Sequence, residues 1–178
     1  MRTDYLKSIC LLCALALLSA CGFALRGSTG IDASLQPVYI SGSRNSQELH
    51  QALKRQFTIN QVAVTQRPGE ARLRVDVQLL DAEKRSITLD REARDAEYAL
   101  YERAQVRLLD AQGKVLRGPR TLQQRRLVVN DSDNPVGEET ESSIVQAEMR
   151  EQLSIRLAQQ VEIWARQLHG DASNAAAP

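Results

Sequence analysis

The chain has 178 residues, of which 23 are Lys or Arg and 22 are Asp or Glu, so its formal net charge at pH 7 is only +1. This balance gives no bulk electrostatic argument for binding of nucleic acid or acidic membranes. The length suits one domain with a sizeable core.

The first 20 residues have the layout of a secretory signal. Two cations, Arg2 and Lys7, precede an apolar run at 8–20 that is too short to cross a membrane. The run ends in Leu-Ser-Ala before Cys21, which resembles the lipobox of bacterial lipoproteins, so we expect Cys21 to be the mature N-terminus and to carry acyl chains. The next residue, Gly22, favours an outer-membrane address. The alternative is an ordinary secretory signal that happens to precede a cysteine.

Removal of residues 1–20 also removes Cys10 and Cys13, and it leaves equal numbers of basic and acidic side chains. With only Cys21 remaining, the mature chain has neither an internal disulfide nor a cysteine metal site. Residues 21–36 are rich in Gly and Ser and are interpreted as the lipidated N-terminus and a tether. A single folded domain is expected at 37–170, followed by a disordered tail at 171–178.

The domain is predicted to begin with a strand at 37–41 (PVYIS) and a helix at about 46–57. Asn45 with Glu48 resembles a capping box at the start of the helix. Four apolar residues then share one helical face: Leu49, Ala52, Leu53 and Phe57. Asn60 is predicted to end the helix in a left-handed conformation.

From Ala71 the apolar period changes from 3.6 to 2, which predicts a strand at 71–79 with one apolar and one charged face. The alternation recurs from Tyr98 to Leu108, with Glu102 interrupting it. A third strand is expected at 115–129, where Gly118 and Pro119 should bulge it or end its pairing. The short connections, one of them the glycine turn at 110–114, predict an antiparallel meander of three strands.

After a turn-rich loop at 130–137, apolar residues three or four apart predict one long helix that ends at Gly170. They are Val145, Met149, Leu153, Leu157, Val161, Trp164 and Leu168. Packing both helices on the apolar face of the meander, with the early strand at its edge, gives an α+β fold, a two-layer sandwich of two helices on a largely antiparallel sheet.

The sequence contains no recognisable catalytic constellation. The two histidines, His50 and His169, lie near no nucleophilic serine motif, and zinc motifs, phosphate loops and dinucleotide fingerprints are absent. Glu138, Glu139 and Glu141 are interpreted as complements to the dipole at the start of the long helix rather than as catalytic acids. We therefore expect no enzymatic activity, no metal and no cofactor.

Arginines recur on the polar side of the predicted strands. They are Arg72 and Arg74 on the first long strand, Arg103 and Arg107 on the second and Arg125 on the third. A guanidinium group can grip two oxygens of a phosphate or carboxylate, so this face is a candidate anion-binding surface. The alternative is a solvated face whose charge is balanced by Asp76 and its neighbours.

Four short motifs, in this order, resemble the LPS-assembly lipoprotein family LptE, also called RlpB. They are CGFALRG after the lipobox, PVYISG before the first helix, AEYAL at the start of a strand, and EMREQLSIRLAQQ in the long helix. The resemblance covers most of the mature chain, and none of its motifs is catalytic. Family members have two helices on a largely antiparallel sheet, which is the architecture that the periodicity predicts.

The resemblance implies a role as a plug inside the large outer-membrane β-barrel LptD and in the delivery of lipopolysaccharide to the outer leaflet. It also implies phosphorylated lipopolysaccharide as a ligand. Arg91 and Arg94, before AEYAL, are the preferred ligand residues because family members often place basic residues there. Family members can also carry a basic residue before the long helix, where this chain has the acidic loop NDSDNPVGEE. The alternative function is that of a generic periplasmic binding lipoprotein, for instance one that grips a cell-wall polymer.

Overall fold

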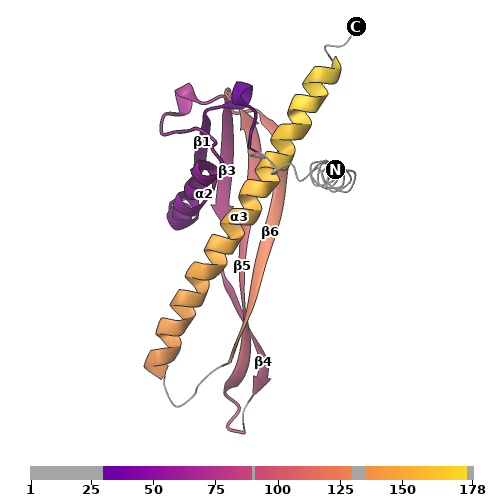
Figure 1. Cartoon of the computed structure of the whole chain (residues 1–178). Coiled ribbons are helices and arrows are strands. Elements are labelled where there is room, and N and C mark those ends of the chain that lie inside the picture. The colour runs from indigo at the N-terminus through magenta and orange to yellow at the C-terminus, as the bar shows by residue number, and fades with distance from the viewer. Residues whose placement is uncertain (1–29, 90, 130–134, 176–178) are drawn as a thin grey trace, which may run out of the picture.

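The computed structural model describes residues 30–89, 91–129 and 135–175, without the side chains of residues 135–139 and 172–175. Within these residues, two α-helices lie on one face of a mixed sheet of six strands (Figure 1). The strands are β1 (Val38–Gly42), β2 (Val64–Thr65), β3 (Leu73–Leu79), β4 (Glu83–Leu89), β5 (Asp95–Asp110) and β6 (Val115–Val129). The helices are α2 (Gln47–Ile59) and α3 (Pro135–Ala175). This arrangement confirms the predicted α+β sandwich.

Strand β5 is the centre of the sheet. One of its edges pairs antiparallel with β6 along almost its whole length, and the other pairs with β3 and then with β4. Because β3 and β4 both run antiparallel to β5 on the same edge, they form one long strand interrupted at residues 80–82. The predicted meander is therefore present, with its first strand extended by β4. Apolar alternation did not reveal β4 because six of its seven residues are exposed.

The remaining strands make the sheet mixed. Strand β1 pairs parallel with β3, and the two-residue strand β2 pairs parallel with the outer edge of β1. Helix α2 connects β1 to β2, as expected for parallel strands that need a crossover. The predicted early strand at the sheet edge is thus confirmed, with β2 added beyond it.

The start of α2 is fixed by side chains that bond to the end of β3. The fully buried Ser46 accepts the backbone N–H of Leu79 at 2.8 Å, and the amide of Asn45 donates to the carbonyl of the same Leu79 at 3.4 Å. The predicted capping box is therefore wrong. Asn45 lies in a 3-10 turn, Arg44–Ser46, and the residue before the helix is Ser46.

The end of α2 also differs from the prediction. Asn60 has a φ of −83°, and the left-handed residue is the next one, Gln61, with a φ of 60°. The physical reason is the pair of capping bonds, in which the Val62 N–H donates to the Phe57 carbonyl at 2.8 Å and the Gln61 N–H to the Thr58 carbonyl at 3.1 Å, because this motif places the left-handed residue one position after the C-cap. The Asn60 amide donates to Glu162 of α3 at 2.5 Å. This bond joins the end of α2 to the middle of α3.

The folded domain begins before the predicted boundary at residue 37. Ile31 is only 3% exposed and belongs to the core, and a 3-10 turn follows it at Ala33–Leu35. Gln36 secures this segment by donating to the Ile31 carbonyl at 2.5 Å and accepting the Ala63 amide at 2.6 Å. One buried side chain in a polar segment leaves no period in the sequence. The rest of the predicted tether, Cys21 included, lies outside the described residues.

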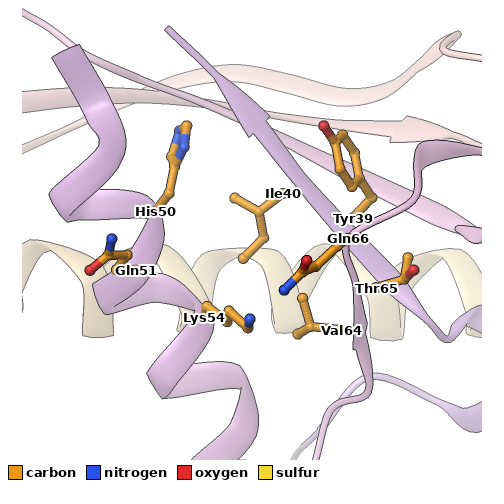
Figure 2. A pocket seen from close by; sticks show the side chains of 8 residues that line it. All are labelled: Tyr39, Ile40, His50, Gln51, Lys54, Val64, Thr65 and Gln66. Atoms are coloured by element: carbon orange, nitrogen blue, oxygen red, sulfur yellow. The ribbon is translucent and has the colours of Figure 1, made fainter. Parts of the chain in front are cut away.

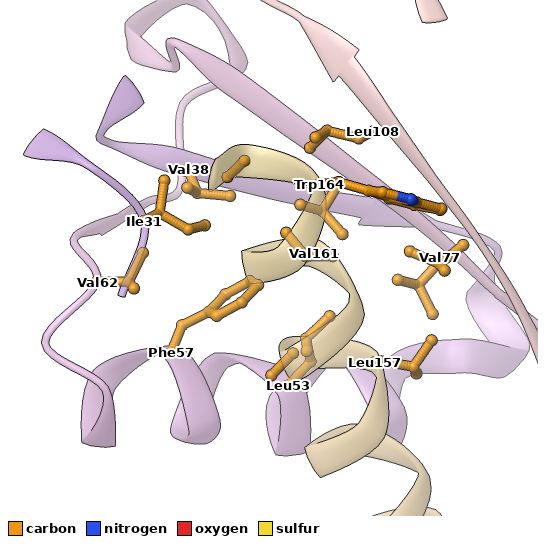
Figure 3. Packing of buried hydrophobic residues seen from close by; sticks show 14 of the residues in the cluster. Ile31, Val38, Leu53, Phe57, Val62, Val77, Leu108, Leu157, Val161 and Trp164 are labelled. Atoms are coloured by element: carbon orange, nitrogen blue, oxygen red, sulfur yellow. The ribbon is translucent and has the colours of Figure 1, made fainter. Parts of the chain in front are cut away.

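The core lies between the sheet and both helices (Figure 3). The predicted stripe of α3 is confirmed, because its five central residues are buried and its two end residues are partly buried. Leu157 and Val161 of this stripe pack in one cluster with Phe57 of α2 and with Val77 and Leu108 of the sheet. Replacing one such buried leucine by alanine costs about 2–5 kcal/mol.

Helix α3 continues through Gly170 to Ala175, so the prediction that Gly170 ends it is wrong. The ion pair between Arg117 of β6 and Asp171, at 2.7 Å, holds the helix beyond the glycine. A helical glycine costs about 0.5–1 kcal/mol relative to alanine, which is small compared with the packing of this long helix. The described part of the predicted tail, up to Ala175, is therefore helical.

The predicted bulge in β6 is confirmed at Gly118 and Pro119. The pairing with β5 shifts between Val106↔Arg120 and Leu108↔Arg117, so Gly118 and Pro119 together oppose the single residue Arg107. Gly118 has a φ of 91°, and a Cβ there would lie 2.8 Å from the Val106 carbonyl oxygen. The backbone therefore requires glycine at this position.

Candidate functional site

The sheet face opposite the two helices, here called the open face, carries most of the predicted arginines. On β5 the even-numbered residues Ala104, Val106 and Leu108 are buried in the core, so the odd-numbered residues lie on the open face. Its charged and aromatic residues include Tyr39 of β1, Arg74 and Asp76 of β3, Glu83 and Arg85 of β4, Glu97, Tyr101, Arg103 and Arg107 of β5, and Arg125 of β6.

Two of the predicted arginines are paired with acids on a neighbouring strand. Arg107 donates through Nε to Asp76, its register partner on β3, at 3.1 Å. Arg103 donates to Glu83 of β4 at 3.2 Å. Asp76 therefore balances Arg107, as the solvated-face alternative expects.

Two more of the predicted strand arginines, Arg72 and Arg74, lie toward the end of the sheet where β3 begins. Arg74 donates to the Pro68 carbonyl at 3.3 Å, and the exposed Arg72 precedes β3, where its backbone N–H donates to the Pro37 carbonyl at 2.9 Å. Both side chains are thus near the loop before β3 rather than near the arginines of the β4–β5 connection.

A cationic cluster surrounds Tyr101 in the middle of the open face. The guanidinium carbons of Arg85 and Arg125 lie 5.1 and 5.9 Å from the centre of its ring, within the range of cation–π contacts. The hydrogen bond from Arg85 lowers the pKa of Glu83 and raises that of Arg85. Glu83 binds both Arg85 and Arg103, whereas Arg125 contacts the Tyr101 ring and has no carboxylate partner among the described residues, so this cluster carries an excess of positive charge. Arg85 was not predicted because β4 was not.

Arg91 and Arg94, the preferred ligand residues, lie in the connection between β4 and β5, here called the tip. Both are exposed, and Arg94 lies 3.6 Å from Glu92. Strand β5 has 16 residues, which at about 3.4 Å each separates the tip from the Arg74 end of the sheet by roughly 50 Å. The six predicted arginines therefore do not form one site.

Exposed apolar side chains lie beside the tip. Ile87 and Leu89 of β4 and Leu127 and Val129 of β6 are all more than 40% exposed. With the two arginines they give the tip an amphipathic surface, which suits a ligand that is both anionic and apolar. The sequence did not predict this surface. Apolar residues near the end of a strand are ordinary strand composition, and nothing in the sequence shows that these side chains are exposed.

His50 has a structural role in this fold. Its ring Nε2 lies 3.2 Å from the Val77 carbonyl oxygen. The ring also lines a pocket of about 260 Å³ between α2 and the β1–β2 edge, where Figure 2 shows it with Lys54 and Ile40. The described residues that line the pocket include no carboxylate or cysteine to work with this histidine.

The remaining predicted features can be placed as follows. Glu141 is exposed near the start of α3, whereas the side chains of Glu138 and Glu139 lie outside the described residues. No group of His, Cys, Asp or Glu in the described part of the chain is arranged to hold a metal ion. In the same residues, no helix is both long and apolar enough to span a membrane.

Glu102, which interrupts the alternation of β5, faces the helices and is almost fully buried. Arg150 of α3 donates to it at 3.1 Å and also pairs with Glu48 of α2. Burial raises the pKa of Glu102, and the opposing effect of Arg150 is smaller. The second oxygen of Glu102 has no donor among the described residues. This triad links α2, β5 and α3 inside the sandwich.

Comparison with known proteins identifies the family. The model of the family LptE, described as lipopolysaccharide-assembly, matches residues 35–161. The chain belongs to the LptE family. It is 30% identical over 164 residues to the LPS-assembly lipoprotein LptE of Photorhabdus laumondii, which covers 87% of this chain and 85% of that protein. Membership of LptE supports a role in lipopolysaccharide assembly.

Solved structures agree with the fold of an LptE protein. Lipoprotein B of Nitrosomonas europaea superposes with a TM-score of 0.65 at 21% identity, covering 82% of this chain and 93% of that one. The rare lipoprotein B of Shewanella oneidensis gives 0.64 at 18% identity, covering 74% and 98%. At these identities the likeness shows the fold alone.

The triad generates a prediction about pH. Because the pKa of Glu102 is raised on folding, its contribution to stability is fully present below the ordinary carboxyl range and is lost as pH rises through its folded pKa. Glu102→Gln removes this dependence. We expect the free energy of unfolding of the variant, relative to the unmodified chain, to increase between about pH 4 and pH 7.5. Urea titrations at several pH values measure it.

The matched control is Glu48→Gln, which removes the exposed carboxylate bound to the same arginine. The free energy of unfolding of Glu102→Gln is compared with that of the unmodified chain. If this difference stays constant or falls as pH rises, it contradicts the raised pKa of Glu102 and the burial that causes it.

Proposed function

We propose that this chain is an outer-membrane lipoprotein that plugs the β-barrel LptD, supports its assembly, and takes part in lipopolysaccharide transport to the outer leaflet. Membership of the LptE family is the observation that carries the proposal. The open face supports it, because the lumen of a large outer-membrane barrel is polar and a charged, hydrogen-bonding sheet face is suited to fill it.

Acyl chains on Cys21 hold the domain at the membrane in this proposal. Only residues 22–29 separate Cys21 from Gly30, where the described domain begins, and they span at most about 30 Å. Gly30 lies beside Asn60 and Val62, at the end of α2. The tip is at the far end of β5, so Gly30 and the tip lie at opposite ends of the domain.

The tip binds lipopolysaccharide in this proposal. Exposed Arg91 and Arg94 supply guanidinium groups for its phosphates, and the neighbouring apolar residues suit its acyl chains. The loop before α3 is acidic, and its residues 130–134 lie outside the described chain, so the proposed site is one-sided. Arg72, Arg74, Arg103 and Arg107 are secondary candidates, because Arg103 and Arg107 already bind carboxylates.

Co-expression with the barrel protein tests the function. We expect the two proteins to co-purify from outer membranes as a complex that resists mild detergent, and depletion of the chain to reduce lipopolysaccharide export. A chain that purifies alone, with export unchanged, fits the alternative of a generic periplasmic binding lipoprotein and contradicts the proposal.

A second prediction concerns the ligand residues at the tip. The double variant Arg91→Ala with Arg94→Ala should weaken lipopolysaccharide binding at least about tenfold, because each charge-assisted hydrogen bond contributes about 1.5–3 kcal/mol. Binding of purified lipopolysaccharide to the delipidated chain provides the measurement.

The control for this variant is Arg67→Ala with Arg166→Ala, which removes the same charge from exposed positions away from the tip. Equal affinity of the tip variant and the unmodified chain would remove Arg91 and Arg94 from the site.

A further inference from the structure

The outer edge of β6 presents unpaired backbone groups. The Leu80 amide donates to the Arg103 carbonyl at 2.8 Å, so the odd-numbered residues of β5 direct their backbone groups toward β3 and β4, and the even-numbered ones toward β6. The residues of β6 opposite the odd-numbered positions therefore direct N–H and C=O away from the sheet. They include Thr121, Gln123, Arg125, Leu127 and Val129.

The half of this edge nearer the β5–β6 turn is protected. Arg156 of α3 donates to the outward carbonyl of Gln123 at 2.6 Å, and the bulge at Gly118 and Pro119 interrupts the strand. Bulges and prolines are among the devices that prevent unwanted pairing at sheet edges.

The other half, Arg125–Val129, has none of these devices in the described structure. Its register with β5 is continuous, and it contains neither glycine nor proline. At this end of the sheet the opposite edge strand is β4, and its pairing with β5 is disrupted by register shifts between Ser86 and Leu89. A regular, unprotected edge is a template for an added strand.

The side chains of this edge indicate which strand fits. Leu127 and Val129 are 58% and 72% exposed on the open face, and Arg125 extends the cationic cluster around Tyr101. In that cluster Glu83 binds Arg85 and Arg103, and Arg125 has no carboxylate partner among the described residues. An acidic side chain opposite Arg125, with apolar side chains opposite Leu127 and Val129, complements the edge in charge and in hydrophobicity.

We propose that Arg125–Val129 binds an extended, acidic segment of the barrel partner by strand addition. The inference rests on the proposed function, which supplies that partner. Three residues with outward backbone groups provide about six main-chain hydrogen bonds. Main-chain bonds give the affinity in this mode, and the alternating side chains give the specificity.

Amide hydrogen exchange of the co-purified complex, compared with the free full-length mature chain, tests the proposal. In the free chain the amides of Arg125, Leu127 and Val129 should exchange quickly, and in the complex they should slow at least about tenfold. Arg126 and Val128 bond to β5 in both states and serve as internal controls. A third sample contains the free chain with purified lipopolysaccharide alone.

Each outcome decides the question. Protection of the three amides in the complex but not by lipopolysaccharide supports strand addition. Equal protection by lipopolysaccharide alone identifies the edge as a lipid site and overturns strand addition. A complex without added protection overturns strand addition while the plug function stands. Failure of the unmodified chain to form a complex overturns the plug function and removes the occupant of this edge with it.

A matched pair of variants tests the same edge. Leu127→Pro removes an outward N–H that β5 does not use, whereas Leu127→Thr shortens the side chain and keeps the N–H. We expect the proline variant, with its melting curve unchanged, to lower the yield of complex at least tenfold, and the threonine variant to change it less than threefold. Equal yields overturn the proposal. If the proline variant unfolds, Arg125→Glu takes its place, with the same tenfold loss expected.

Discussion

Strand β5 is the element on which the rest of the structure depends. It is hydrogen-bonded on both edges, to β6 on one and to β3 and β4 on the other. Its even-numbered residues face α2 and α3 and supply part of the core, while its odd-numbered residues form the middle of the open face. At 16 residues it also sets the distance between the tip and the end of the sheet where β3 begins.

The parts of the fold with strong apolar periodicity were predictable from the sequence. The stripe of α3, the apolar face of α2 and the alternation of β3 and β5 each bury enough apolar side chain to mark the element and its face. The predictions that were wrong or missing concern parts of the fold that are held by interactions other than a periodic apolar face. Strand β4 is held by backbone pairing with few buried residues, Ile31 is one side chain in a polar segment, and α3 passes Gly170 because Arg117 holds Asp171.

The candidate site was only partly predictable for a related reason. Alternation places Arg103 and Arg107 on the polar face, but the register of neighbouring strands decides which acid each one meets. Asp76 lies opposite Arg107, and Glu83 of the unpredicted β4 reaches Arg103. Glu102 breaks the alternation because its buried carboxylate binds Arg150, which also binds the exposed Glu48. Such a triad requires contacts across three elements that no local pattern contains.

Gly30 lies near the end of α2, where the described chain begins, and the basic, partly apolar tip lies at the other end of the sheet. A distance between spin labels at Arg94→Cys and Gly69→Cys, in the mature chain carrying Cys21→Ser, measures whether β5 holds these ends apart. A single narrow distribution near about 50 Å, unchanged when the barrel partner is bound, is the expected result. A distance below about 35 Å, or a broad distribution, would show that the tip folds back and that the two ends are not separated as described.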